Sequence, residues 1–202
     1  MMRRRRFIQA LARSQAGTTI TEFGLIAPIF MTMVMGALDL GHTLYMQSTL
    51  QGAVQKAARD STLESGGTTA NQTAINTAIT DQVQRLAKGA TVTITRTSFR
   101  DYTKAASRTK EPFTDTNGNG TCNAGEPYED SNNSGSWDID NGTTGQGGAK
   151  DSVILSTQIS YPRLFPFLKA IGLPANVTMN ATTVLVNQPY GDQAAVTVRN
   201  CT

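Results

Sequence analysis

The longest apolar stretch of the chain lies near its N-terminus. Residues 23–38 contain no charged side chain, and after Asp39 the apolar pattern continues to Leu44. A helix over this stretch would be about 33 Å long, which matches the hydrocarbon core of a bilayer. Apolar residues keep a helical spacing beyond it, until two glycines at 66–67. The pattern therefore predicts one helix over residues 18–65, the first half of which (about 23–44) crosses a membrane.

The remaining residues, 66–202, show the patterns of a small mixed domain. Residues 71–88 carry apolar side chains at helical spacing, and residues 164–171 read as a short apolar helix or turn between prolines. Alternating apolar and polar residues predict strands at 91–99, 152–161 and 177–186, with a short fourth strand at 194–199. The predicted fold class is α+β, with a long N-terminal transmembrane helix packed on a small, mostly antiparallel β-sheet head.

Basic residues are concentrated before the apolar span. The chain carries 18 Lys and Arg against 15 Asp and Glu, but five of the arginines lie within residues 1–17. By the positive-inside rule, this places the N-terminus in the cytoplasm and the head across the membrane. A cleaved secretory signal peptide is the rival interpretation. We favour it less because a cleavage site needs small residues, whereas Met35 occupies the outer position of the candidate site. No basic or aromatic surface elsewhere supports nucleic-acid binding.

Residues 115–126, DTNGNGTCNAGE, match the twelve-residue pattern of a calcium-binding loop. Side-chain oxygens occupy positions one, three, five and twelve, and glycine occupies position six, where the loop turns sharply. Positions seven and nine can add a backbone carbonyl and a further polar group. The candidate ligands of this first loop are Asp115, Asn117, Asn119, Thr121, Asn123 and Glu126.

A degenerate copy of the pattern follows at residues 130–141, DSNNSGSWDIDN. It keeps oxygen-bearing side chains at positions one, three and five and glycine at six. At position twelve it has Asn141, where the first loop has a carboxylate that can bind in a bidentate manner. The candidate ligands of this second loop are Asp130, Asn132, Ser134, Ser136, Asp138 and Asn141. The tandem predicts one or two bound Ca²⁺ ions.

A flexible loop without metal is the alternative interpretation, because glycine, asparagine and aspartate dominate turns for their own reasons. Charge favours the metal: residues 111–140 hold seven acidic residues and no Lys or Arg, and their repulsion favours disorder unless cations bind. Pro112, Pro127 and the glycines at 142–148 argue against flanking helices. We therefore expect a structural calcium site in an insertion at 111–150, and not a sensor that opens a groove.

The two cysteines, Cys122 and Cys201, are too few and too far apart in sequence for a zinc site. In an oxidising compartment they could form a disulfide that ties the first loop to the C-terminal segment. Two free thiols are the alternative. We favour the disulfide because the head is predicted to lie outside the cytoplasm.

No catalytic constellation is recognisable in the sequence. It contains no nucleophile elbow, no phosphate-binding glycine loop and no zinc-protease motif. The single histidine, His42, lies in the apolar span, and the paired carboxylates all lie in the calcium-like loops. We therefore expect a protein that is not an enzyme.

The residues just before the apolar run resemble a type IV prepilin processing site. Gly17 is followed after four residues by Glu22 and Phe23, as in the Flp-type subclass, although that subclass has tyrosine at the last position. Four stretches resemble the TadE-like minor pilins (pseudopilins) of the tight-adherence pilus system: GTTITEFGLIAPIF, LDLGH, LQGAVQKAARDS and the more weakly matching ATTVLVNQPYGD. The calcium-like insertion is not required by the pattern of that family.

The resemblance implies a type IV pilin-like fold and cleavage after Gly17 by a prepilin peptidase. Residues 1–17 would be a basic leader, Thr18 the new N-terminus, and Glu22 the fifth residue of the mature chain. The implied partners are the membrane, other pilin or pseudopilin subunits, the peptidase and the tight-adherence secretion platform. The implied location is the bacterial inner membrane, as a single-pass protein with a cytoplasmic N-terminus and a periplasmic head, or the pilus outside the cell.

Two functional hypotheses follow. The first is a minor pilin that takes part in assembly or adhesion of a tight-adherence pilus and carries a calcium-ordered loop on its head. The second is a membrane-anchored or secreted calcium-binding adhesion module that never enters a filament. The mature N-terminus distinguishes them: the first predicts Thr18, and the second predicts Met1 or a start beyond residue 37.

Overall fold

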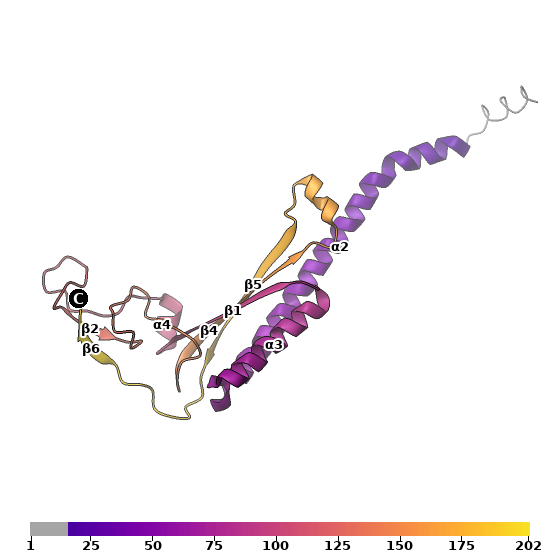
Figure 1. The fold of residues 1–202 in the computed structure, drawn as a ribbon. Coiled ribbons are helices and arrows are strands. Elements are labelled where there is room, and N and C mark those ends of the chain that lie inside the picture. Colours follow the sequence, from indigo (N-terminus) through magenta and orange to yellow (C-terminus); the bar gives the residue numbers. More distant parts are fainter. Residues whose placement is uncertain (1–15) are drawn as a thin grey trace, which may run out of the picture. The chain divides into compact units, whose positions relative to one another are not determined.

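The computed structural model describes residues 16–202 (Figure 1). Most of the basic leader predicted at 1–17 therefore lies outside the described residues. The chain divides into two compact units. One unit consists of the chain up to Thr43 together with Arg163–Ala175, and the other consists of Leu44–Pro162 and Asn176–Thr202.

Between Ala16 and the first strand, the structure has three helical segments. They are α2 (Ala16–Ser61), the 3₁₀ helix η1 (Glu64–Gly67) and α3 (Thr69–Leu86). The predicted long N-terminal helix is thus confirmed as far as Ser61. After the helix ends, Gly66 packs against its last residue. Only glycine fits there, because a Cβ at this position would lie 2.5 Å from the Ser61 carbonyl oxygen. α3 begins after Thr68, whose hydroxyl accepts a hydrogen bond from the amide of Asn71.

The main sheet has four antiparallel strands in the order β3-β1-β4-β5. They are β1 (Thr91–Phe99), β3 (Thr143–Thr144), β4 (Ser152–Pro162) and β5 (Asn176–Val186). Ser152 at the start of β4 pairs with Phe99 of β1 on one side and with Val186 of β5 on the other. The three long strands match the predicted ones. Along β4 and β5, buried and exposed side chains largely follow the alternation of apolar and polar residues in the sequence.

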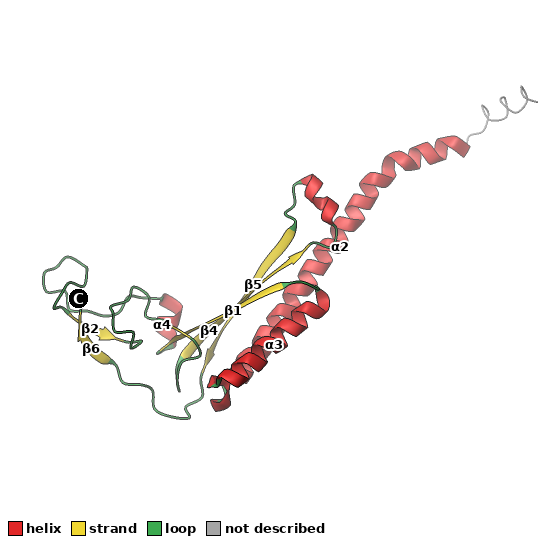
Figure 2. Ribbon diagram, viewed as in Figure 1, coloured by secondary structure: helices red, strands yellow, loops and turns green. Residues whose placement is uncertain are grey.

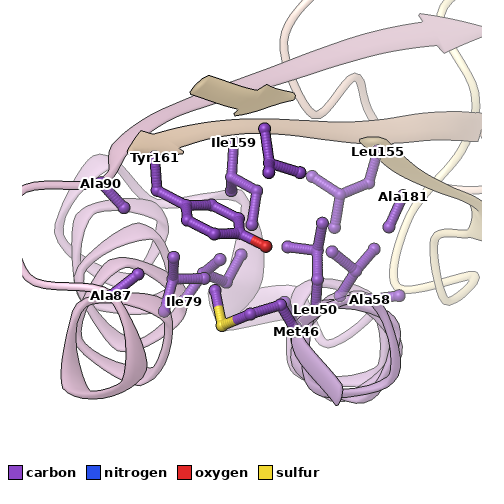
Figure 3. Packing of buried hydrophobic residues seen from close by; sticks show 14 of the residues in the cluster. Met46, Leu50, Ala58, Ile79, Ala87, Ala90, Leu155, Ile159, Tyr161 and Ala181 are labelled. Atoms are coloured by element: carbon purple, nitrogen blue, oxygen red, sulfur yellow. The ribbon is translucent and has the colours of Figure 1, made fainter. Parts of the chain in front are cut away.

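The second half of α2, together with α3, packs against one face of this sheet (Figure 3). The buried side chains of α2 recur once per helical turn, and they face apolar side chains of α3 and of the central strands. They are Met46, Leu50, Val54, Ala57 and Ala58 of α2, Ile79 and Val83 of α3, and Val153, Leu155, Ile159, Tyr161 and Ala181 of the sheet. The predicted α+β fold, a long N-terminal helix packed on an antiparallel sheet, is confirmed.

The connection between β1 and β4 is long and consists mostly of loop (Figure 2). Besides β3 it contains the short helix α4 (Tyr102–Ser107) and β2 (Pro127–Asp130). β2 pairs with β6 (Thr197–Asn200) in a separate two-stranded antiparallel sheet. The short strand predicted at 194–199 therefore exists near its expected position, but its partner lies in the long connection and not in the main sheet.

The loop that joins β4 to β5 contains the 3₁₀ helix η2 (Pro166–Ile171). Arg163 organises this loop, because its backbone N–H donates to the carbonyl of Ala175 at 3.0 Å. Its guanidinium also forms an ion pair with the carboxylate of Asp39 in α2. The side chains of Arg163 and Asp39 are 15% and 6% exposed, so this ion pair is largely withdrawn from solvent.

Candidate functional site

Backbone amides converge on Asp115, the first residue of the first loop. Its Oδ1 accepts hydrogen bonds from the amides of Gly118 and Asn119 at 2.7 and 3.2 Å, and its Oδ2 accepts one from Gly120 at 2.7 Å. Gly118 and Gly120 have φ angles of 72° and 76°, which residues with a Cβ rarely adopt. The chain therefore curls around the Asp115 carboxylate, along the kind of path that a cation loop with glycine at position six requires.

The oxygens at positions three and five lie along the same turn. Oδ1 of Asn117 accepts from the amide of Asn119 at 3.0 Å, and Oδ1 of Asn119 accepts from the amide of Thr121 at 2.9 Å. Asn123, at position nine, donates to Oδ1 of Asn119 at 3.1 Å and to the carbonyl of Thr121 at 2.9 Å. The structure thus brings the side chains predicted for positions three, five and nine, and the carbonyl at seven, into one hydrogen-bonded group.

Glu126 closes the first loop. Its side chain is buried; Oε1 accepts hydrogen bonds from the amide and the hydroxyl of Thr116, and Oε2 accepts one from the amide of Asn123, each at 2.8 Å. These hydrogen bonds lower the pKa of Glu126 to about 2, and the one from the Asn123 amide has the largest effect. The carboxylate is therefore ionised at neutral pH and bridges positions two and nine of its own loop.

The second loop repeats this path. Oδ1 of the fully buried Asp130 accepts from the amide of Ser134 at 2.9 Å, and its Oδ2 accepts from Gly135 at 3.0 Å. Oδ1 of Asn132 accepts from the same Ser134 amide at 2.9 Å, and the Ser134 hydroxyl oxygen accepts from the amide of Ser136 at 3.2 Å. Gly135, at position six, has a φ of 83°. Positions one, three, five and six therefore have the same roles in both loops.

Asp138, at position nine of the second loop, lies among the other candidate ligands. Its Oδ2 accepts from the Ser134 hydroxyl at 2.7 Å and from the amide nitrogen of Asn132 at 2.9 Å. In the part of the chain that the structure describes, no three acidic, histidine or cysteine side chains come together as a metal-binding group. A cation in either loop would therefore depend on amide, hydroxyl and carbonyl oxygens as well as carboxylates, a mixed oxygen set that Ca²⁺ accepts.

The closing contacts of the second loop come from a residue that the sequence analysis did not single out. Asn141, at position twelve, is buried, yet neither atom of its amide group has a hydrogen-bond partner. The closing contacts are made by Glu111, which is fully buried. Its carboxylate accepts hydrogen bonds from the amides of Ser131 at 2.7 Å and Asp138 at 3.1 Å. Burial raises the pKa of Glu111. Nothing in the spacing of the twelve-residue pattern points to Glu111, because it precedes both loops.

The C-terminal segment is attached to both loops. Cys122 of the first loop forms a disulfide with Cys201, with the two Cα atoms 5.9 Å apart. The amide of Cys201 also donates to the carbonyl of Glu126 at 2.9 Å. In β6, Nε of Arg199 donates to Oδ2 of Asp130 at 2.6 Å. Loss of order in either loop would therefore also loosen the C-terminal segment.

The N-terminal motif occupies the first turns of α2. Gly17, Thr18, Glu22 and Phe23 are all exposed, and among the described residues the Glu22 carboxylate has no ion-pair partner. The large apolar side chains along this part of the helix are exposed as well, namely Ile20, Leu25, Ile26, Ile29, Phe30, Met33, Leu38, Leu40 and Leu44. Within the described range one helix, Gly17–Ser61, is long and apolar enough to cross a membrane, with a mean hydropathy of 1.8 in its apolar part. This helix suggests membrane anchoring.

Comparison with known proteins finds a family match over the N-terminal segment. Residues 17–59 match the family model TadE, described as TadE-like protein. No curated protein and no solved structure matches the chain. The matched segment begins at the glycine of the processing motif and ends within α2, so it contains the motif and the apolar run but neither the sheet nor the two loops.

Proposed function

We propose that this chain, whose residues 17–59 are TadE-like, is a minor pilin or pseudopilin that takes part in assembly or adhesion of a tight-adherence type IV pilus. The family match confirms the resemblance found in the sequence and suggests involvement in the tight-adherence pilus system. The head lies outside the matched segment, so its role depends on its own geometry.

The observation that carries the proposal is the uncovered apolar surface of α2 within the matched segment. Leu25 and Phe23 are 77% and 64% exposed, and their apolar neighbours are similarly uncovered. A contiguous apolar surface of this kind marks a membrane or protein interface. Lipid would cover it in an anchored subunit, and the helices of other pilin or pseudopilin subunits would cover it in a filament.

Glu22 supports a role in assembly, because a carboxylate at the head of a lipid-embedded helix is costly unless it is paired. Cleavage after Gly17 by a prepilin peptidase would create an α-ammonium group at Thr18, one helical turn before Glu22 and on the same face. In a helical assembly the ammonium of a neighbouring subunit could take that place. The pairing would then set the axial register between subunits.

The two loops of the head support a structural Ca²⁺ role. The first wraps carboxylate, amide and carbonyl oxygens, and the second carboxylate, amide and hydroxyl oxygens, each in a tight turn with glycine at position six. Binding of one or two ions would neutralise an acidic segment that has no basic residue between 111 and 140. The ordered loops would then present a fixed surface on the head, which we place in the periplasm or, in a pilus, outside the cell.

The alternative is an anchored or secreted calcium-binding adhesion module that never joins a filament. Site-specific photo-crosslinking separates the two, with the crosslinker in place of Leu25 and assayed in cells that assemble the pilus. The pilin proposal predicts crosslinks to other pilin or pseudopilin helices. Crosslinks to lipid alone would contradict it and would leave the adhesion module as the better account.

A further inference from the structure

We propose that Glu111 supplies the acidic closing ligand of the second loop, which makes this loop a complete Ca²⁺ site although its twelfth residue is Asn141. This inference rests on the proposed calcium role of the two loops. It assigns a ligand that lies outside the contiguous sequence pattern. The head would then bind two ions.

Glu111 makes the same two contacts with the second loop that Glu126 makes with the first. Glu126 accepts hydrogen bonds from the amides at positions two and nine of its loop, both at 2.8 Å. Glu111 accepts hydrogen bonds from positions two and nine of the second loop, Ser131 and Asp138, at 2.7 and 3.1 Å. In both cases the two amides bind different oxygens of the carboxylate, so the two side chains occupy equivalent places.

The Glu111 carboxylate retains the capacity to bind a cation. Each oxygen of an ionised carboxylate has about two acceptor positions. Among the described residues, Oε1 accepts from Ser131 and Oε2 from Asp138, which leaves one position on each oxygen. Two available oxygens on one carboxylate are what a bidentate contact with Ca²⁺ requires.

The backbone of the second loop supports this transfer of roles. At position four, Gly118 of the first loop and Asn133 of the second have φ angles of 72° and 56°. At position six, Gly120 and Gly135 have φ angles of 76° and 83°. Asparagine is one of the few residues with a side chain that enters this region readily. The two loops therefore follow one path, and a ligand position in the first has a counterpart in the second.

Charge in the second loop favours a cation. Glu111 and Asp130 are both completely buried. Asp130 is paired with Arg199, whereas Glu111 has no cationic partner among the described residues. A divalent cation held by the Glu111 carboxylate together with amide, hydroxyl and carbonyl oxygens of the loop would offset the cost of burying this charge.

Asn141 provides an independent indication. Its side chain is 2% exposed and lines a cavity of about 170 Å³ together with Ser131 and Asn132 of the second loop. Neither atom of its amide group has a hydrogen-bond partner, although buried amides are nearly always paired. An unpaired, buried amide at position twelve of the second loop indicates a place for a further polar group, such as an ion or its water. Asn141 makes neither of the closing contacts, which belong to Glu111.

Terbium and calcium titrations of the full chain in detergent test the proposal. Trp137 is the single tryptophan of the chain and donates a hydrogen bond from its indole to the Glu111 carbonyl at 3.0 Å. Terbium emission excited through Trp137 therefore reports an ion close to this tryptophan, and calorimetry with Ca²⁺ counts all ions. Because Lys110 lies near both the Trp137 ring and the Gly120 carbonyl of the first loop, a first-loop variant is needed to separate the two sites. The variants are Glu111→Gln, Glu111→Asp, Asn141→Asp and, for the first loop, Glu126→Gln.

We expect wild type to bind two ions and to show tryptophan-sensitised emission that Ca²⁺ displaces. Glu111→Gln should weaken that emission and lose one ion, with affinity at the second loop reduced on the order of tenfold or more, because a charged ligand is lost. Glu111→Asp should recover part of the affinity, and Glu126→Gln should keep the emission. Asn141→Asp should bind like wild type, and this result can be interpreted even if Glu111→Gln does not fold.

The opposite outcomes identify which step is wrong. Two ions and full emission in Glu111→Gln, or an Asn141→Asp variant that tightens the second site tenfold, would overturn the role of Glu111. A wild type that binds a single ion, lost in Glu126→Gln, would overturn it as well while leaving calcium at the first loop intact. A wild type that binds no ion would remove the calcium role of both loops and would not affect the proposed place in the pilus system.

Discussion

Asp39 and Arg163 lie 124 positions apart in sequence and form an ion pair between α2 and the loop that joins β4 to β5. Both side chains are largely buried, so removing one charge leaves the other without a partner. Asp39→Asn should destabilise the packing of residues 163–175 on the order of 3 kcal/mol. Limited trypsin digestion in detergent should then cut faster after Lys169, which is exposed within this loop.

Asp60→Asn is the matched control for this prediction. It removes the ion pair of Asp60 with Lys56, whose side chains are 49% and 74% exposed. An exposed helical pair contributes only about 0.3–0.5 kcal/mol, so digestion should proceed as in wild type. If Asp39→Asn were also cut at the wild-type rate, the ion pair would have no structural role.

Cys201→Ser should loosen the C-terminal segment. The disulfide to Cys122 closes a loop with a sequence separation of 79 residues, and losing such a link typically lowers the free energy of unfolding by about 2–5 kcal/mol. Hydrogen exchange should accelerate at the amides of Cys201 and Gly125, which pair across the two segments. Val198→Ala, an exposed change in β6, is the control. Unchanged exchange in Cys201→Ser would show that β2–β6 pairing alone fixes the segment.

Chelation should make the insertion sensitive to proteolysis between residues 112 and 150. Without cations, the acidic residues of the two loops repel one another and the loops lose order. A protease that needs no calcium itself should cut this region faster in EDTA than in excess Ca²⁺. Glu126→Gln should reproduce the effect of EDTA on the first loop more strongly than Asn141→Gln. Identical cleavage patterns with EDTA and with calcium would rule out a structural metal.

Glu22→Ala should leave membrane insertion intact and disrupt incorporation into the pilus. The substitution removes the proposed partner of a neighbouring α-ammonium but leaves the apolar run unchanged. The measurement is the amount of protein in the membrane fraction and in sheared pili. Thr21→Ala, next to it on the exposed start of α2, is the control. Wild-type incorporation of Glu22→Ala would argue against a role in subunit register.

The regular elements of the fold could be predicted because their signals are local. Helical spacing of apolar residues gave α3 within two residues at each end, and alternation gave β1, β4 and β5 within one residue. The six-residue α4 was not predicted, because it has no apolar stripe. It depends on an N-terminal cap, in which the side chain of Asp101 accepts a hydrogen bond from the amide of Lys104.

Long-range relationships could not be predicted in the same way. β2 and β6 have four residues each, and their pairing is set by contacts between segments about 70 positions apart. Glu111 precedes both loops, so a contiguous twelve-residue pattern cannot include it. The pairing of Asp39 with Arg163 depends on how the loop after β4 folds. In each case the fold, and not the local sequence, selects the partner.

The most direct test of the account is the N-terminus of the protein purified from its native membrane or pili. Intact mass and N-terminal peptide analysis should give a chain that begins at Thr18 and requires detergent or assembly into fibres to stay in solution. Cells lacking the prepilin peptidase should give the unprocessed chain. A water-soluble monomer from native cells, beginning at Met1 or beyond residue 37, would contradict the account.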